Sequence, residues 1–389
     1  MKKKILIVSS WYPSEESPIN GCFVQDQAIV LSKKYDVSVL FLHIPGWRSL
    51  LKRKILPKSH IEYHDNLIVF SETILLPPNI LFSYRKLLLK KIILHRFKKI
   101  ISRWGFPDLI HSHVVWAGGW AAVNIAKKYK IPVVLTEHSG PFSMHLKSKS
   151  QRKLVRKILN EVDKIVAVSP ALADQILSFY KSKTIDIVGN VIRALFFEPG
   201  YKRVNNLSQS KIKFLSVATL NEQKGIQYLI KAGHHLNKQG ILSFEIIIAG
   251  DGPMRSDLES MANNLGIADN CKFLGLVAHN DIRDLMQLCD VFVLPSLAET
   301  FSVVVAEAMA CGKPVIATRC GGPEFIVEEG TGLLVNIADH KELAEAMYKF
   351  INKQIKFDEN FIRYNIFSRF GEDAFLYIIS SIYEDLWKR

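Results

Sequence analysis

Two glutamates, Glu299 and Glu307, flank the segment "AETFSVVVAE", whose centre is apolar. Ionised carboxylates accept strong hydrogen bonds from hydroxyl groups, so two of them at a fixed spacing suit a ligand with hydroxyls at both ends. The apolar run Val291–Leu294 just before the segment predicts a strand, and a helix is expected to begin around Ser302. Eight residues at about 1.5 Å each then separate the two acids by at most roughly 12 Å along a helix axis.

The expected start of that helix is itself a binding feature. Its first backbone N–H groups have no partner within the helix and the helix dipole is positive there, so this position favours a phosphate. Lys224, in the loop "ATLNEQKG" after another apolar run, could add a positive charge. A diphosphate at the helix start, with sugar hydroxyls at one glutamate and ribose hydroxyls at the other, describes a nucleotide sugar. The segment therefore predicts a nucleotide-sugar site.

The elements that must position these side chains alternate along the chain between apolar, β-rich runs and longer amphipathic segments. This alternation predicts parallel sheets with helices on both faces, and hence an α/β fold of two Rossmann-like domains that face each other across a cleft. The expected strands are Ile5–Val8, Val37–Leu42, Leu67–Phe70, Leu109–His111, Val133–Thr136, Ile165–Val168 and Ile185–Val188 in the first half, and Ile212–Val217, Phe244–Ala249, Lys272–Leu274, Val291–Leu294, Val315–Ala317 and Leu333–Val335 in the second.

Ligands of such sheets bind beyond the carboxyl ends of the strands, so the loops at this end are the candidate site. In the second half, "GDGP" begins with Gly250, where a missing side chain lets a ligand approach the backbone, although a plain tight turn also needs glycine. In the first half, "HSH" brings His111 and His113 to a strand end, and "TEHSG" does the same for Glu137 and His138. Histidines at strand ends are also common structural residues, and the sequence leaves both interpretations open.

Composition excludes several classes of protein. The 389 residues are 48% hydrophobic and 23% charged, which is typical of a globular chain with two domains and excludes disorder. No apolar run approaches the roughly 18 residues of a membrane span, and the first run is too short for a signal peptide. The five cysteines are scattered without zinc-binding spacing, which predicts reduced thiols in a cytoplasm.

The net charge of +14 is unevenly distributed. Residues 1–200 carry 31 Lys and Arg against 14 Asp and Glu, a net of +17, whereas the remainder carries 20 against 23, a net of −3. This asymmetry indicates two domains with different partners. The polar stretch from Glu198 to Lys211 is the expected hinge, which gives predicted domains of residues 1–197 and 198–371.

Several blocks in order resemble the retaining glycosyltransferases of family 4 (glycosyl transferases group 1), over nearly the whole chain. The blocks are "GNV....FEP" at 189–199, "KG" at 224–225, "GDGP" at 250–253, "FLG" at 273–275 and the E-x7-E segment within 295–316. The resemblance implies the GT-B fold, an acceptor-binding first domain, a donor-binding second domain and a C-terminal helix, 372–389, that crosses back to the first. It also implies transfer from a nucleoside diphosphate sugar, UDP- or GDP-linked, to a glycan or lipid-linked glycan hydroxyl, with retention at the anomeric carbon.

The resemblance assigns roles to matching residues. Glu299 and His113 would contact the donor sugar, with Glu299 supporting the transition state, and Lys224 would neutralise the diphosphate. Glu307 would hold the ribose. The implied donor-binding set is Thr219, Lys224, Gly250, Leu276, Val277, Glu299, Thr300, Phe301, Ser302, Val303 and Glu307, with the backbone near Leu276 and Val277 at the base; Gly21 and His138 would lie in the loops for acceptor and phosphate.

One position departs from the family pattern. Where the family carries arginine in a G-R-L triplet, this chain has Ala218-Thr219-Leu220, and a threonine cannot form a bidentate charged contact. No Asp-x-Asp occurs, so no metal ion is expected on the diphosphate, and no cofactor beyond the nucleotide-sugar co-substrate. A nucleotide-sugar epimerase and a non-catalytic nucleotide-sugar-binding subunit stay open as alternatives.

The segment Tyr84–Trp104 predicts an amphipathic helix. Its apolar side would hold Leu87, Leu89, Ile93, Leu94, Phe97, Ile100, Ile101 and Trp104, and its basic side Lys91, His95, Arg96, Lys98, Lys99 and Arg103. A domain helix with a solvated basic face is the first interpretation. The positive first half and the basic stretch Trp47–Lys58 also favour peripheral contact with an anionic membrane, at the inner face of the cell membrane. No nucleic-acid module is recognised, so no nucleic-acid partner is expected.

Overall fold

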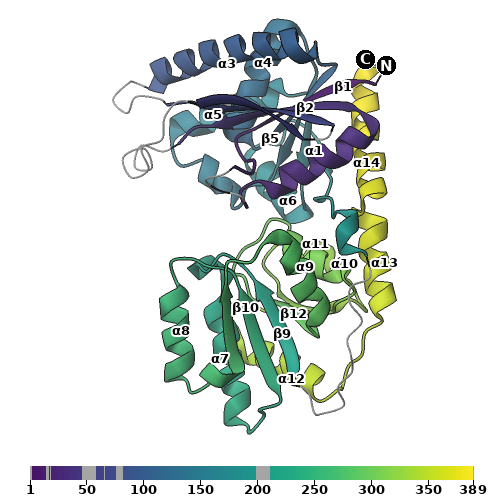
Figure 1. The fold of residues 1–389 in the computed structure, drawn as a ribbon. Coiled ribbons are helices and arrows are strands. Elements are labelled where there is room, and N and C mark those ends of the chain that lie inside the picture. The colour runs from purple at the N-terminus through teal and green to yellow at the C-terminus, as the bar shows by residue number, and fades with distance from the viewer. Residues whose placement is uncertain are drawn as a thin grey trace. The chain divides into compact units, whose positions relative to one another are not determined.

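The computed structural model describes residues 2–14, 17, 19–45, 58–64, 66–75, 82–198 and 211–388. The chain divides into two compact units, shown in Figure 1. Unit 1 comprises Met1–Val191 with Phe375–Arg389, and unit 2 comprises Ile192–Ala374. Most of the expected hinge, and the stretch Trp47–Pro57, lie outside the described residues.

Unit 1 is built on one sheet, whose order among the described residues is β3-β4-β2-β1-β5-β6-β7-β8. Neighbouring strands are parallel except for β3 and β4. The strands are β1 (Lys4–Ser9), β2 (Asp36–His43), β3 (Lys58–His64), β4 (Leu67–Thr73), β5 (Leu109–His113), β6 (Val133–Glu137), β7 (Lys164–Ala167) and β8 (Ile185–Ile187). The predicted parallel α/β fold is confirmed, and each expected strand of this half is present.

Among the described strands, the antiparallel edge strand β3 is the one that the sequence did not predict. Its residues, "KSHIEYH", alternate polar and apolar side chains without an apolar run, and both ends of the strand are exposed. An edge strand can be this polar because only one of its sides pairs with the sheet. The periodicity that marks buried parallel strands is therefore missing from it.

Helices cover both faces of the sheet in unit 1. On one face lie α1 (Cys22–Lys34) and α14 (Glu372–Trp387), which run side by side in Figure 1. Their apolar side chains share one core with β1 and β2, and the α14 members of this core are Phe375, Ile379, Ile382, Tyr383 and Leu386. The other helices of the unit are α3 (Phe82–Trp104), α4 (Trp120–Tyr129), α5 (Lys149–Glu161) and α6 (Pro170–Phe179). The helix α14 thus completes unit 1 although it follows unit 2 in the chain.

The expected amphipathic helix is present as α3, but fewer residues lie on its apolar side than the sequence predicted. Leu89, Ile93 and Phe97 are buried, whereas Leu87 is 53% exposed. At 100° per residue Leu87 lies roughly 120° from the centre of the buried stripe, so its assignment to the apolar side is wrong. Arg96, expected on the solvated side, is only 25% exposed, and its Nε lies 3.0 Å from Oε2 of the buried Glu72. None of the described helices is both long and apolar enough to cross a membrane.

Unit 2 has a fully parallel sheet, in the order β11-β10-β9-β12-β13-β14 among the described residues. Its strands are β9 (Ile212–Val217), β10 (Phe244–Ala249), β11 (Cys271–Gly275), β12 (Val291–Leu294), β13 (Val315–Thr318) and β14 (Gly332–Val335). The helices α7 (Ile226–Lys238), α8 (Arg255–Asn264) and α12 (His340–Ile351) pack their apolar residues on one face. The others are α9 (His279–Leu288), α10 (Val303–Ala310), α11 (Pro323–Ile326) and α13 (Glu359–Phe370).

Each sheet has a point at which the chain reverses its direction across the sheet. In unit 1, β1 lies between β2 and β5; in unit 2, β9 lies between β10 and β12. At such a point the loops that follow the two central strands diverge, which leaves a crevice at the carboxyl ends of the strands. The loops after β9 and β12 carry Lys224 and Glu299, and the strand β5 ends at His113.

Candidate functional site

The loops after β9 and β12 of unit 2 are bonded to each other. The backbone N–H of Leu297 donates to the Gln223 carbonyl at 2.8 Å, and the Gln223 side-chain amide donates to the Ala298 carbonyl at 2.9 Å. Gly225 stands where they are closest, with φ of 68°, and a Cβ there would lie 1.9 Å from the Pro295 carbonyl oxygen. Only glycine allows this approach, which is the physical reason for the "KG" pair.

This approach brings Lys224 to Glu299. The Lys224 Nζ lies 2.7 Å from the Glu299 Oε1, and the Ser296 hydroxyl donates to the same oxygen at 2.8 Å. The two charged side chains are 27% and 12% exposed, so water screens the pair only in part. The Glu299 backbone is also held, because its N–H donates to the Cys320 carbonyl at 3.0 Å. Among the described residues both side-chain contacts fall on Oε1, which leaves Oε2 for a ligand.

Ser302 occupies the position directly before α10, which begins one residue later than expected. Its φ of 75° and ψ of 64° are left-handed, a conformation that costs a residue with a Cβ roughly 1–2 kcal/mol. The residue is 6% exposed, and its hydroxyl has no hydrogen-bond partner among the described residues. A buried unpaired hydroxyl costs about 1–3 kcal/mol more. Both costs fall on one residue at the N-terminus of α10.

Two other predicted donor residues lie on loops at the same end of the sheet. Gly250 follows β10 with φ of 134°, and a Cβ there would lie 1.9 Å from the Ala218 carbonyl oxygen. Thr219 is exposed after β9, and its carbonyl accepts from the Asn221 N–H at 2.8 Å. Leu276 is 71% exposed after β11, whereas Val277 beside it is half-buried. The close approach of Gly250 to the Ala218 carbonyl is therefore a structural reason for glycine at this turn, independent of any ligand.

The segment from Thr300 to Glu307 has a more mixed burial than the prediction implied. Thr300 and Val303 are half-buried. The Phe301 ring is 1% exposed and meets the Phe370 ring edge-on at 5.2 Å, so this side chain belongs to the core and only its backbone could face a ligand. Glu307 is 5% exposed within α10, and is therefore not the solvated helix residue that such a glutamate would ordinarily be.

In unit 1, three histidines, His111, His113 and His138, form a buried histidine cluster. Pairing of β5 with β6 sets His113 opposite Thr136, next to the chain leading to His138. The His113 Nδ1 lies 2.9 Å from the His138 Nε2, and the ring centroids of His111 and His113 are 4.4 Å apart. Both nitrogens of His111 are bonded, Nε2 to the Thr136 hydroxyl at 2.7 Å and Nδ1 to the Tyr383 hydroxyl at 2.6 Å.

Burial keeps the histidine cluster uncharged. It lowers the pKa of His111 and of His138 to about 3, and holds the pKa of His113 well below the usual 6.5. The fully buried Nε2 of His113 has no hydrogen-bond partner among the described residues. His113 can therefore offer a neutral hydrogen bond at Nε2, and its role toward the donor sugar stays a prediction.

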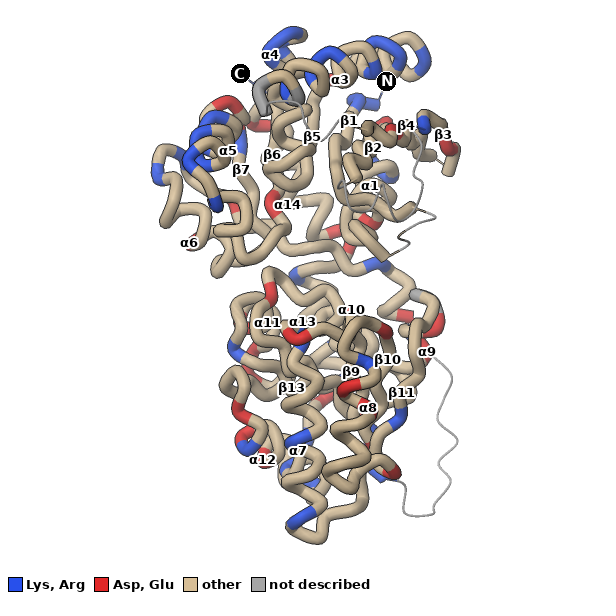
Figure 2. The backbone as a smooth tube through the Cα atoms, turned by 90° about the vertical axis from the view of Figure 1, so that its left-hand side faces the viewer, with Lys and Arg blue, Asp and Glu red and all other residues tan. Residues whose placement is uncertain are grey.

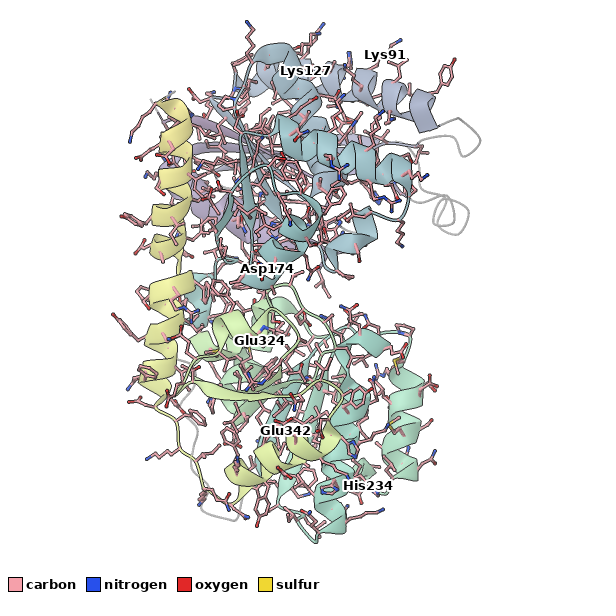
Figure 3. The ribbon with its side chains drawn as sticks, turned by 180° about the vertical axis from the view of Figure 1, so that it is seen from behind. Lys91, Lys127, Asp174, His234, Glu324 and Glu342 are labelled. Atoms are coloured by element: carbon pink, nitrogen blue, oxygen red, sulfur yellow. The ribbon has the colours of Figure 1, made fainter. Side chains whose placement is uncertain are left out.

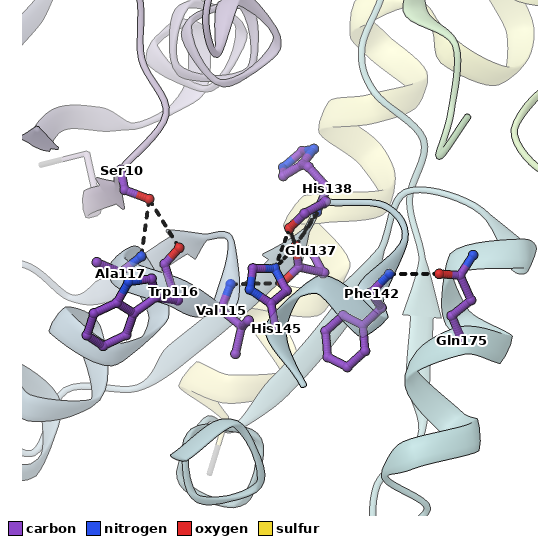
Figure 4. Close-up of polar contacts among 10 residues, drawn as sticks. Ser10, Val115, Trp116, Ala117, Glu137, His138, Phe142, His145 and Gln175 are labelled. Carbon is purple, nitrogen blue, oxygen red and sulfur yellow. Dashed lines mark hydrogen bonds and ion pairs between the residues drawn. The ribbon is translucent and has the colours of Figure 1, made fainter. Parts of the chain in front are cut away.

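Glu137, at the end of β6, anchors the loops around the histidine cluster (Figure 4). Its Oε2 accepts from the Val115 N–H at 2.8 Å, and its Oε1 accepts from the N–H groups of His138 at 3.0 Å and Ser139 at 2.8 Å. The Ser139 hydroxyl also bonds the His145 Nε2 at 2.8 Å. The sequence marked Glu137 only as a polar residue at a strand end, and gave no signal for Ser139 or His145.

The loop after β1 meets the loop after β5. The Ser10 hydroxyl accepts from the Ala117 N–H at 3.2 Å, a contact also drawn in Figure 4. Gly21, expected in an acceptor and phosphate loop, precedes α1 with φ of 74°, and a Cβ there would lie 2.4 Å from the Trp11 carbonyl carbon. Gly21 is thus required by the backbone. Within the described parts of both units, no group of three His, Cys, Asp or Glu side chains is arranged to hold a metal ion.

Comparisons with known proteins agree with this arrangement. The family model "Glycosyl transferases group 1" matches residues 198–366, and "Glycosyltransferase Family 4" matches residues 23–194. An uncharacterised glycosyltransferase of Methanocaldococcus jannaschii is 30% identical over 260 residues, 66% of this chain and 69% of the relative. A putative teichuronic acid biosynthesis glycosyltransferase of Bacillus subtilis is 28% identical over 365 residues, 90% of each chain.

Solved structures share the fold. Sucrose-phosphate synthase from Thermosynechococcus elongatus superposes with a TM-score of 0.77 at 22% identity, over 100% of each chain. An Anabaena protein crystallised with UDP-glucose superposes with a TM-score of 0.73 at 19% identity, over 99% of this chain and 100% of its own. The order of the matched blocks, the two parallel-sheet units and these relatives lead to one conclusion: the chain belongs to the glycosyl transferases group 1 and has the GT-B fold.

Proposed function

We propose that the protein is a metal-independent, retaining glycosyltransferase that moves a sugar from a nucleoside diphosphate sugar to a hydroxyl of a glycan or lipid-linked glycan. Unit 2 binds the donor and unit 1 binds the acceptor. The observation that carries the proposal is the buried, unpaired Ser302 hydroxyl at the N-terminus of α10, three residues after Glu299, whose carboxylate is paired with Lys224. Such a group suits a diphosphate oxygen, and the adjacent carboxylate suits a sugar hydroxyl.

The donor diphosphate rests on the first N–H groups of α10 and on the Ser302 hydroxyl, where the helix dipole favours negative charge. Lys224 supplies the countercharge. Its ammonium lies 2.7 Å from the Glu299 carboxylate, so a bound diphosphate and Glu299 would share it. Glu299 then turns its Oε2 to the sugar hydroxyls, and Glu307 serves the ribose.

Transfer breaks the bond between the anomeric carbon and the diphosphate oxygen and forms the bond to the acceptor oxygen on the same face. The acceptor hydroxyl passes its proton to the departing phosphate oxygen. Glu299 stabilises the positive charge that develops on the sugar, and the open Nε2 of His113 makes a neutral hydrogen bond to a sugar hydroxyl. Because His113 is uncharged, it adds orientation without adding charge.

No metal ion takes part in the proposed reaction. The sequence lacks an Asp-x-Asp motif, and Lys224 with the α10 N-terminus supplies the positive field that a divalent ion would give. Thr219 stands where the family carries arginine. Stabilisation of the negative charge on the leaving diphosphate therefore depends on Lys224 more strongly than in relatives with that arginine. The only co-substrate needed besides the acceptor is the nucleotide sugar.

The backbone around Leu276 and Val277 contacts the base of the donor in this proposal. An Anabaena structure of the same fold was solved with UDP-glucose, and a Bacillus subtilis relative is named for teichuronic acid biosynthesis. A UDP-sugar and a cell-surface polysaccharide or its lipid-linked precursor are accordingly the first candidates, with GDP-sugars second.

A donor panel tests the proposal. Thermal unfolding is measured with UDP-, GDP- and ADP-sugars, and a true donor at 100 times its dissociation constant adds about 2.7 kcal/mol to the unfolding free energy. The stabilising donor is then incubated with and without acceptor glycans, in the presence of a chelator, and the anomeric configuration of the product is determined. Glu299→Ala should abolish transfer; unchanged transfer would overturn the assignment. Conversion of the donor without acceptor would instead indicate an epimerase, and binding without turnover a binding subunit.

We also propose that unit 1 contacts an anionic membrane, which would bring it to a lipid-linked acceptor. Lys and Arg gather on α3, α4 and α5 in Figure 2, and Figure 3 shows Lys91 and Lys127 pointing outward from α3 and α4. A groove of about 560 Å³ lies among these helices. Its lysines are Lys86, Lys90, Lys127, Lys153 and Lys157, its floor includes Trp120, Val123, Leu154 and Ile158, and its acidic residue is Glu161.

Charge favours lipid headgroups in this groove, because each lysine near an anionic surface contributes about 1 kcal/mol. Glu161 is 3.7 Å from the Lys127 Nζ and 3.9 Å from the Lys157 Nζ, which leaves an excess of positive charge. Flotation with phosphatidylglycerol vesicles is compared with flotation on phosphatidylcholine vesicles. The double variant Lys90→Glu, Lys153→Glu should lose binding to the anionic vesicles, whereas the double variant Lys238→Glu, Lys349→Glu, at exposed positions of unit 2, serves as the matched charge control. Equal and negligible flotation with both lipids would remove the membrane hypothesis.

A further inference from the structure

His138 is more deeply buried than a residue of a ligand-binding loop needs to be. It is 5% exposed, and the Phe23 ring packs on its face with the centroids 4.5 Å apart. Its Nε2 lies 2.9 Å from the Nδ1 of His113. The ring of His113 is thus hydrogen-bonded to that of another histidine.

The geometry of this contact ties the proton of one ring to that of the other. A neutral imidazole carries one N–H, so a hydrogen bond between two neutral rings needs a donor on one ring and an acceptor on the other. If His138 donates from Nε2, the proton of His113 is on its own Nε2; if His138 accepts there, the proton of His113 is on Nδ1. In both cases the tautomer of His138 decides whether the open Nε2 of His113 donates to a ligand or accepts from it.

No other described neighbour can set that proton. His111 packs on the face of His113 at 4.4 Å, but both of its nitrogens are taken by the hydroxyls of Tyr383 and Thr136. His111 therefore restrains the plane of the His113 ring and not its proton. Behind His138, the Gln27 side-chain amide donates to the Asn190 Oδ1 at 3.1 Å, in a buried contact. The Nδ1 of His138 has no hydrogen-bond partner among the described residues, so within this part of the chain its ring bonds through Nε2 to His113.

We propose that His138 is a positioning residue that fixes His113 in a single tautomer, and so determines the hydrogen bond that His113 makes to the sugar. This deepens the proposed function and rests on it for the role of His113 toward the donor. The tautomer itself needs no ligand, because every contact that sets it is within unit 1.

Nitrogen-15 NMR of the ring nitrogens of His113 in the unliganded, full-length protein tests the proposal. The wild-type protein should show one tautomer. His138→Phe keeps the ring and the contact with Phe23 but removes the hydrogen bond, and should change the tautomer fraction of His113. Tyr383→Phe is the matched control, because it removes a buried hydrogen bond of similar cost from His111 without touching a nitrogen of His113, and it should leave that fraction unchanged.

Kinetics give a second readout. In His138→Phe, kcat/KM for the donor should fall roughly 10-fold or more, as the loss of one oriented hydrogen bond predicts, and His138→Gln should recover part of it because an amide can bond Nδ1. A mixture of tautomers in the wild-type protein, or an unchanged His113 in His138→Phe, would overturn the positioning role. If the tautomer responds as expected and no donor is ever turned over, the proposed function fails and the positioning role stands. If His138→Phe does not fold, a mixture of tautomers in the wild-type protein still overturns the role, and His138→Gln, which keeps a hydrogen bond to Nδ1, is the second variant in which the His113 tautomer is measured.

Discussion

Replacing Ser302 with glycine should stabilise the unliganded protein and weaken its binding of the donor. Ser302 is left-handed at φ 75°, 6% exposed, and has an unpaired hydroxyl among the described residues. Glycine adopts this conformation without strain and carries no hydroxyl to bury. The same change removes a group that we propose binds the diphosphate, so stability and affinity should move in opposite directions.

The expected magnitudes follow from these terms. Relief of the left-handed backbone contributes roughly 1–2 kcal/mol and removal of the buried hydroxyl about 1–3 kcal/mol, against about 0.5–1 kcal/mol for the greater chain entropy of glycine in the unfolded state. The net gain is about 2 kcal/mol, which raises the Tm of a unit of this size by roughly 4–8 °C. Loss of a charge-assisted hydrogen bond worth about 1.5–3 kcal/mol should weaken donor binding roughly 10- to 100-fold.

Calorimetric unfolding without ligand and titration with the donor measure the two effects. Ser302→Ala is an informative control, because it loses the hydroxyl but keeps the Cβ and its strain, and should gain only part of the stability. Ser296→Ala should instead lower the stability, because the Ser296 hydroxyl donates a hydrogen bond to Glu299 at 2.8 Å. A lower Tm for Ser302→Gly, or donor binding as tight as in the wild-type protein, would refute the reasoning.

Three further predictions concern the two units separately. In unit 2, truncating Lys224 and Glu299 to alanine singly and together should give a coupling free energy of about 1–2 kcal/mol in denaturant unfolding, because the pair is only partly exposed to water; additive effects would contradict the contact. Gly225→Ala should prevent the loops after β9 and β12 from meeting, because its Cβ would lie 1.9 Å from the Pro295 carbonyl oxygen, and it should abolish donor-induced stabilisation. The control is Gly240→Ala, which tests the cost of a positive φ alone because a Cβ there meets nothing within 4 Å. In unit 1, the lowered pKa values of the histidine cluster mean that the unfolded chain binds protons below pH 6.5 that the folded chain does not. The free energy of unfolding is therefore full above pH 6.5 and falls by up to about 1.4 kcal/mol per pH unit and histidine on acidification toward pH 3. His111→Gln should make that slope shallower, and an unchanged slope would show that His111 titrates normally.

The fold could be predicted because buried parallel strands appear in the sequence as apolar runs. The expected strands Ile212–Val217, Phe244–Ala249 and Val291–Leu294 coincide with β9, β10 and β12. The edge strand β3 has no such run, because one of its sides faces no partner strand. The exposure of Leu87 shows a related limit, since an apolar residue at the margin of a helical stripe is buried only if another element covers it.

The candidate site could be predicted in its residues but not in its contacts. Chain order placed Lys224 and Glu299 after neighbouring strands, yet their 2.7 Å contact depends on the turn at Gly225. The left-handed Ser302 had no signal, because sequence indicates positive φ chiefly through glycine. The contact between His113 and His138 depends on the register of β5 against β6, which buried apolar runs leave undetermined.

The place of α14 in the core of unit 1 has a consequence for how the chain folds during synthesis. Tyr383, fully buried and bonded to His111, leaves the ribosome only after all of unit 2 has been made. Unit 2 can bury its own core first. Unit 1, although synthesised earlier, keeps an apolar surface on β1, β2 and α1 exposed until α14 has been made. Nascent unit 1, rather than unit 2, is then the part most in need of chaperone protection.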